Sequence, residues 1–94
     1  MRVKVTYLGV VRHKVGINEE EFVLPEGSTL KDLFMKIADA HDALKDLIGG
    51  LSESPVDPTL IVTLNGLAIN LTSISEITLK DGDVLALMTV IGGG

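Results

Sequence analysis

One long amphipathic segment lies between two groups of short strand-like runs, and this arrangement constrains the fold more than any other feature. Apolar residues recur at helical spacing from Leu30 to Ile48, while charged residues occupy the rest of the helical wheel. Thr29 and Asp32 have the spacing of a capping box, and Ser28 is the alternative cap. Glycines follow directly after Ile48 and supply a stop. The pattern predicts one helix of about 18–20 residues with a single buried face.

Strand-like runs with period two or a short apolar core stand on both sides of this helix. The predicted strands are residues 2–10, 17–24, 60–64, 67–71 and 84–91. Residues 11–16 are expected to form a turn, 51–58 a loop, and 73–76 a turn of helix. Asn65-Gly66 predicts a type I′ hairpin, because both central positions of that turn need positive φ.

The order of these elements predicts the architecture. A helix between two halves of one sheet must cross over, and a right-handed crossover places the last strand beside the first and parallel to it. One helix packed on one face of a mixed sheet is the β-grasp architecture, of the α+β class. We therefore expect one β-grasp domain over residues 1–91, followed by a flexible glycine tail at 92–94.

Composition excludes several classes of function. A chain of 94 residues forms one domain. Its net charge of -5 argues against nucleic acid, which needs Lys and Arg to neutralise phosphates. The absence of cysteine removes disulfides, thiolate catalysis and Cys-based metal sites. The chain shows no membrane span, no signal-peptide core, no P-loop and no paired-carboxylate site, so we expect a cytoplasmic protein that is no enzyme on its own.

The chain ends in three glycines directly after the last apolar run. Extended residues from Thr89 to Gly94 span roughly 20 Å, at ~3.3–3.6 Å each. Glycine has no side chain, so such a tail can carry the carboxylate of Gly94 down a narrow channel in another protein. The alternative is a frayed end without function.

Three short motifs of the chain resemble those of a known family. They are LPEGSTLKDL at 24–33, VTLNG at 62–66, and DGD at 81–83 before a final strand that ends in glycines. Together with the order of elements, they resemble the ubiquitin-like sulfur carriers, which include the small subunit of molybdopterin synthase (MoaD) and the thiamine-pathway carrier (ThiS). Two departures concern the tail: Thr89 and Val90 stand where the family usually has proline, and Gly92 takes the place of a small residue before the functional pair Gly93-Gly94.

The resemblance implies a chemistry for the tail. An activating enzyme of the MoeB/ThiF type would use ATP and Mg²⁺ to adenylate Gly94, and sulfur would then convert it to a thiocarboxylate. A large synthase subunit of the MoaE type would take this sulfur for molybdopterin, the ligand of molybdenum or tungsten. This chain itself is expected to bind no cofactor and no metal. A thiamine-pathway carrier, a protein modifier joined to lysines through Gly94, and a plain β-grasp binding domain stay open as alternatives.

Partner docking needs a surface as well as a tail. Strand alternation predicts that Leu85 and Leu87 face the helix and that the residues between and after them lie on the open face of the sheet. The family places apolar contacts at corresponding positions of the first and last strands. The expected partner-binding residues are Leu8, Leu67, Ala86, Met88, Ile91 and Gly92. Scattered apolar surface groups without a partner are the alternative.

Other polar residues carry weaker signals. His41 is expected to be a packed or boundary residue on the helix, and His13 is too far away in the sequence to form a metal pair with it. Arg12, His13 and Lys14 are expected to form a solvated basic turn, with a partner contact as the alternative. Residues 19–21, three glutamates, are expected to form a solvated edge or bulge.

Overall fold

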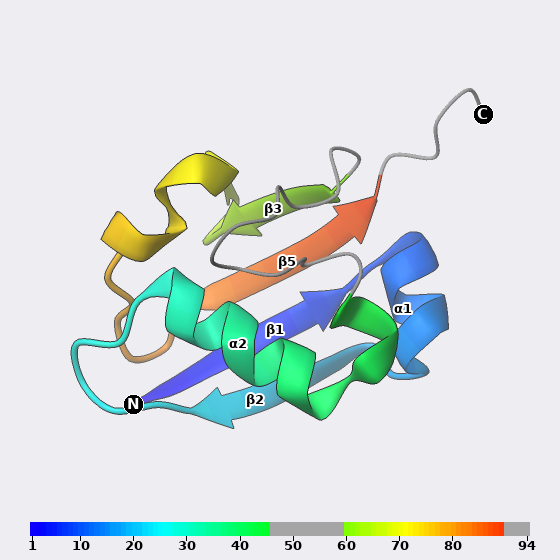
Figure 1. The fold of residues 1–94 in the computed structure, drawn as a ribbon, viewed down its shortest axis with the longest axis horizontal. Coiled ribbons are helices and arrows are strands. Elements are labelled where there is room, and N and C mark those ends of the chain that lie inside the picture. Colours follow the sequence, from blue (N-terminus) through cyan, green and yellow to red (C-terminus); the bar gives the residue numbers. More distant parts are fainter. Residues whose placement is uncertain (46–59, 90–94) are drawn as a thin grey trace.

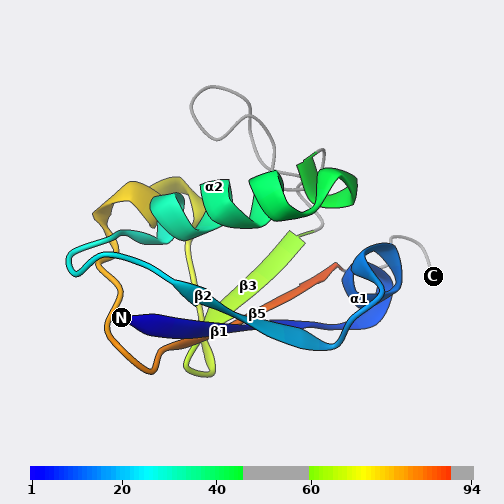
Figure 2. The same cartoon turned by 90° about the horizontal axis from the view of Figure 1, so that it is seen from below.

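The computed structural model describes residues 1–45 and 60–89. In these ranges one long helix covers one face of a five-stranded mixed sheet (Figures 1 and 2). The strands are β1 (Arg2–Tyr7), β2 (Glu19–Val23), β3 (Leu60–Leu64), β4 (Leu67–Ala68) and β5 (Val84–Thr89). The helical elements are α1 (Gly9–Val15), α2 (Leu30–Ala40), and the 3₁₀ helices η1 (Asp42–Leu44) and η2 (Leu71–Glu76). Several predictions lie outside the described residues: the end of the helix at 46–48 with its stop at 49–50, the loop at 51–58, the end of the last strand at 90–91 and the tail at 92–94.

The sheet has the strand order β2-β1-β5-β3-β4. β1 and β5 are parallel neighbours at its centre, whereas β1–β2, β5–β3 and β3–β4 are antiparallel. This confirms the crossover predicted from the order of elements and with it the α+β, β-grasp architecture. The predicted Asn65-Gly66 turn is also confirmed, with φ of 53° and 85° at the two positions.

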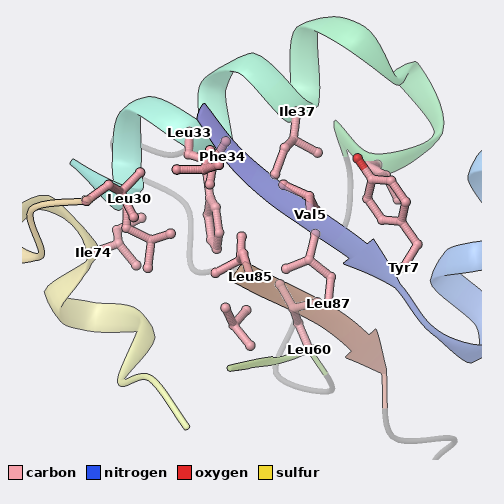
Figure 3. Close-up of a cluster of buried hydrophobic side chains, with 14 of the residues drawn as sticks. Val5, Tyr7, Leu30, Leu33, Phe34, Ile37, Leu60, Ile74, Leu85 and Leu87 are labelled. Atoms are coloured by element: carbon pink, nitrogen blue, oxygen red, sulfur yellow. The ribbon is translucent and has the colours of Figure 1, made fainter. Parts of the chain in front are cut away.

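The core lies between α2 and the sheet (Figure 3). β1 contributes Val5 and Tyr7, and β5 contributes Leu85 and Leu87, each of which is at most 1% exposed. α2 meets them with a stripe that recurs at helical spacing and consists of Leu30, Leu33, Phe34 and Ile37. The predicted orientation of β5, with Leu85 and Leu87 toward the helix, is therefore confirmed. Full burial of such a side chain stabilises the fold by about 1.5–3 kcal/mol.

The start of α2 follows the sequence prediction. The amide of Asp32 donates to Thr29 Oγ1 at 3.3 Å, and the amide of Thr29 donates to Asp32 Oδ2 at 2.8 Å. These two bonds form the predicted capping box and satisfy amides that the first helical turn leaves free. Ser28 is not the cap, because its hydroxyl donates to the carbonyl of Pro25 at 2.7 Å.

The end of α2 differs from the prediction. The helix stops at Ala40, well before Ile48, because His41 adopts an extended conformation with φ -135° and ψ 98°. The His41 ring contacts Glu20 of β2, so a tertiary contact holds the residue where the helix breaks. His41 is half-buried at this boundary rather than on a helical stripe.

A second difference concerns the expected turn at 11–16. Residues from Gly9 to Val15 form α1, which ends at Gly16 with φ of 81°. The helix is short, and only Val11 and Val15 point toward the core. A periodic pattern cannot show in so few residues, and β-branched valines weaken the helical signal further. The strand predicted at 67–71 is also shorter, because η2 begins at Leu71.

Three polar side chains meet under the end of α2. Tyr7 Oη donates to Glu20 Oε2 at 2.6 Å, and His41 Nε2 contacts the same carboxylate oxygen. The rings of Tyr7 and His41 meet edge to face with centroids 5.7 Å apart. Glu20 therefore faces inward and ties β1, β2 and α2 together, which corrects the expectation of a solvated edge for this residue. Its neighbours Glu19 and Glu21 are exposed, as expected.

Ionisation of the Tyr7 phenol is expected to lower the free energy of unfolding at alkaline pH. Burial, followed by the hydrogen bond to Glu20 and its charge, raises the pKa of Tyr7 above its usual range. The folded state thus favours the neutral phenol, and this contribution is present below about pH 10 and lost as pH rises further. We expect the free energy of unfolding to fall by up to about 1.4 kcal/mol per pH unit above pH 10. Urea titrations at several pH values measure the free energy of unfolding of the wild type and of Tyr7→Phe. The variant should lack the decline that ionisation of Tyr7 causes above about pH 10.

Tyr7 is the only tyrosine in the chain, so absorbance at 295 nm reports its ionisation directly. An ordinary phenol titration in the folded protein, or equal alkaline slopes for wild type and variant, would contradict this assignment.

Candidate docking surface and tail exit

The open face of the sheet carries apolar groups on its three central strands. Strand alternation places Ala86 and Met88 there, since Leu85 and Leu87 are buried against α2. Met88 is 36% exposed and Ala86 is half-buried. The structure therefore places both predicted residues on the expected face, while their role in binding stays a prediction.

Strand register extends this surface to neighbouring strands. Met88 lies opposite Ile61 of β3, and Ala86 lies between Thr6 of β1 and Thr63 of β3. Ile61 was missed in the sequence, although its position between the inward Leu60 and Val62 is the signal that reveals it. These residues form two rows across the strands. Met88 and Ile61 form one row, and Ala86 forms the other with the two threonines.

Leu8 joins the same surface at the end of β1. Its backbone is extended, with φ -123° and ψ 148°, so alternation continues past the buried Tyr7 and turns Leu8 to the open face. Its amide donates to the carbonyl of Leu87 at 3.0 Å, which holds it beside the Leu87–Met88 peptide. We call Leu8, Ile61, Ala86 and Met88 the docking surface.

Leu67 is not part of this surface, contrary to expectation. It lies opposite Leu64, and Leu64 lies opposite Leu85, which is buried under α2. Leu67 therefore belongs to the helix-bearing face of the sheet, at the β4 edge, where it is 73% exposed. The register of the β3–β4 hairpin, which pairs Leu64 with Leu67, determines this face. The apolar character of Leu67 alone does not show on which face it lies.

The docking surface lies at the end of the sheet where β5 finishes. β5 ends at Thr89, opposite Leu60 at the start of β3, and α1 packs against β5 at this same end (Figure 1). The other predicted site residues, which are Ile91, Gly92, Gly93 and Gly94, lie outside the described part of the chain. Thr89, the last described residue, follows Met88 at the end of β5 where α1 packs.

Charged groups bound the docking surface on the β2 side. Lys4 Nζ lies 3.8 Å from Glu19 Oε1 across the first two strands. A shallow open hollow at this edge is lined by Lys4 and residues 19–21. Because both partners are exposed, the pair adds little to stability, but it makes this part of the sheet polar.

The described ranges hold no group of three or more His, Cys, Asp or Glu side chains that could bind a metal ion. The same ranges contain no helix that is both long and apolar enough for a membrane span. The cluster of Tyr7, Glu20 and His41 lies on the helix-bearing side and is formed by contacts within the fold. This cluster and the docking surface therefore lie on opposite faces of the sheet.

Comparisons with known proteins give the family. The ThiS family model matches residues 5–94. The molybdopterin synthase sulfur carrier subunit of Chlamydomonas reinhardtii is 31% identical over 98 residues, which cover all of both chains. A putative molybdopterin converting factor subunit 1 from Pyrococcus furiosus is 31% identical, with a TM-score of 0.77 over 97% of this chain and 99% of the other.

A further structural neighbour is a protein modifier by name. The small archaeal modifier protein 1 (SAMP1) of Methanosarcina acetivorans is 26% identical, with a TM-score of 0.78 over 99% of this chain and 96% of the other. The family match begins at Val5 within β1, includes every later described element and continues to residue 94. With its β-grasp fold, this chain belongs to the ThiS family of ubiquitin-like sulfur carriers.

Proposed function

We propose that this chain is the sulfur carrier subunit of a molybdopterin synthase and that the carboxylate of Gly94 carries the sulfur. The observation that supports this most is the full-length similarity to a molybdopterin synthase sulfur carrier subunit. The family match that reaches Gly94 and the position of the docking surface beside the end of β5 add to it. The chain would work in the cytoplasm, where its partners and ATP are present.

The tail supplies the reacting group, and partners supply the catalysis. An α-carboxylate is ionised at neutral pH and is a poor acyl donor. In the proposed activation, one carboxylate oxygen of Gly94 attacks the α-phosphate of ATP, and pyrophosphate leaves. A sulfur nucleophile then attacks the acyl-adenylate, AMP leaves, and a thiocarboxylate remains. ATP and Mg²⁺ would be bound by a MoeB/ThiF-like enzyme, so this chain needs no cofactor of its own.

Two partners would use the docking surface in turn. The activating enzyme comes first, and a MoaE-like large subunit then receives the thiocarboxylate and transfers its sulfur to the pterin precursor. Ile91 and Gly92 would pass through the mouth of each partner's channel, while Leu8, Ala86 and Met88 bind outside it. Met88 suits both contacts, because an unbranched thioether side chain adapts to different surfaces.

A second function shares the first chemical step. The 26% identity to a small archaeal modifier protein favours conjugation of Gly94 to lysines of other proteins. A thiamine-pathway carrier is the third candidate, since the matching family model is that of ThiS. All three need the same adenylate, and they differ in what attacks it or what receives the sulfur.

The first prediction of the proposed function concerns Gly94. Intact mass of the chain purified from its host should show a gain of about 16 Da, because sulfur replaces one oxygen of the carboxylate. Deletion of Gly94, or addition of one phenylalanine after it, should abolish this gain and leave the melting temperature almost unchanged. Wild-type chain from cells that lack the activating enzyme is the control and should show no gain. Sulfur transfer by the truncated chain would refute the carrier proposal, and adducts to larger proteins would favour the modifier.

The second prediction concerns Met88. Met88→Arg places a charge in an apolar contact and should weaken binding to the large subunit by about tenfold or more. The free energy of unfolding should change by less than about 1 kcal/mol, since Met88 is partly exposed. Isothermal titration calorimetry measures the first effect and urea denaturation the second.

Val23→Arg is the matched control, because Val23 is 66% exposed on the same open face but lies opposite Arg2, at the β2 edge and at the end of the sheet away from Met88. Equal losses of binding in Met88→Arg and Val23→Arg would show that the docking surface is not where partners bind. A large loss of stability in Met88→Arg would show instead that Met88 belongs to the core.

A further inference from the structure

The outer face of α1 is basic. Val11 is 1% exposed and packs with Val15 against the core, so the rest of this short helix faces outward. Arg12, His13 and Lys14 follow one another there and are all exposed. Among the residues that the structure describes, the ion pairs involve Lys4, His41 and Lys45, and none of these three. We call Arg12, His13 and Lys14 the basic face.

This basic face contrasts with the charge of the whole chain, which is -5. Elsewhere in the described ranges, two lysines form ion pairs: Lys4 Nζ lies 3.8 Å from Glu19 Oε1, and Lys45 Nζ lies 3.0 Å from Asp42 Oδ1. Lys31 and Lys80 are each followed directly by an aspartate in the sequence. α1 itself contains no acidic residue. An uncompensated cationic face on an acidic domain concentrates the attraction for an anionic surface at one place.

The basic face is also continuous with the docking surface. Leu8 belongs to that surface and is at the same time the N-cap residue of α1. α1 packs against β5, at the end of the sheet where β5 finishes at Thr89 (Figures 1 and 2). A protein that covers Leu8 and Met88 and admits the residues after Thr89 must therefore approach α1 as well.

We propose that the basic face docks on an acidic rim, built of Asp and Glu side chains, around the opening through which a protein partner admits the glycine tail. This inference rests on the proposed function and adds to it the charge and position of the second contact. The apolar docking surface supplies contact area, and the basic face steers the approach and sets the orientation of the tail. Charge complementarity of this kind acts mainly on the rate and orientation of association.

The test is steady-state kinetics of tail activation. The probe is the purified enzyme of the same host that adenylates Gly94, followed by ATP–pyrophosphate exchange as the concentration of carrier varies. Reversal of charge in R12E/K14E should raise KM for the carrier by about tenfold at low salt and leave kcat unchanged. The difference should shrink as added salt screens the charges. R12Q/K14Q should give an intermediate KM and guards against a folding defect of the reversed variant.

The matched control is K36E/K80E, which changes net charge equally. Lys36 lies on the exposed side of α2, and Lys80 precedes β5 at the end of that strand opposite to Thr89. Its KM should stay within about twofold of wild type. An equal rise of KM in K36E/K80E would show an effect of net charge alone and overturn the proposal. Unchanged KM in R12E/K14E overturns it too, while the carrier function stands. A wild-type chain that supports no exchange overturns the carrier function as well.

Discussion

The rest of the structure depends on the parallel pairing of β1 with β5 at the centre of the sheet. Val5 lies opposite Leu85 and Tyr7 opposite Leu87, so strands from the two ends of the chain share one buried face. A slip of one residue in this register would turn the core outward and bury the docking surface. Hydrogen bonds hold the start of β5 in place: Asn65 Nδ2 donates to Asp83 Oδ1 and the Val84 amide donates to Asn65 Oδ1, both at 2.9 Å.

This pairing also separates the side chains of β5 into a buried set and an outward-facing set. Leu85 and Leu87 of β5 are buried in the core, whereas Ala86 and Met88 of the same strand face away from it. The described part of β5 ends at Thr89, at the end of the sheet where α1 packs. In the proposed function, a reaction at Gly94 would need no change in the core, because the docking surface and the core use different side chains of the same strand.

Features that depend on neighbouring residues in the chain were predicted from the sequence, whereas features that depend on distant contacts were missed. The capping box at Thr29, the Asn65-Gly66 turn and the faces of β5 follow from neighbours in the chain, and all were predicted correctly. The end of α2 was missed because it depends on the contact of His41 with Glu20, a residue 21 positions away. α1 was missed because its helix is stabilised by packing of Val11 and Val15, which seven residues cannot reveal as a pattern.

The face of Leu67 was missed for a different reason: the predicted Asn65-Gly66 turn already pairs Leu67 with Leu64, and the sequence prediction did not apply this register. Register also places exposed apolar residues of the open face outside the docking surface, because Val23 lies opposite Arg2 and Val84 lies opposite Lys4. On the β2 side the face carries Lys4 and Glu19, and charged residues on an edge strand oppose pairing with another sheet. Exposed apolar residues on a sheet carry a risk of self-association. The Lys4–Glu19 pair on the β2 side and the basic residues of α1 place charges on two sides of the docking surface, which opposes pairing with another copy.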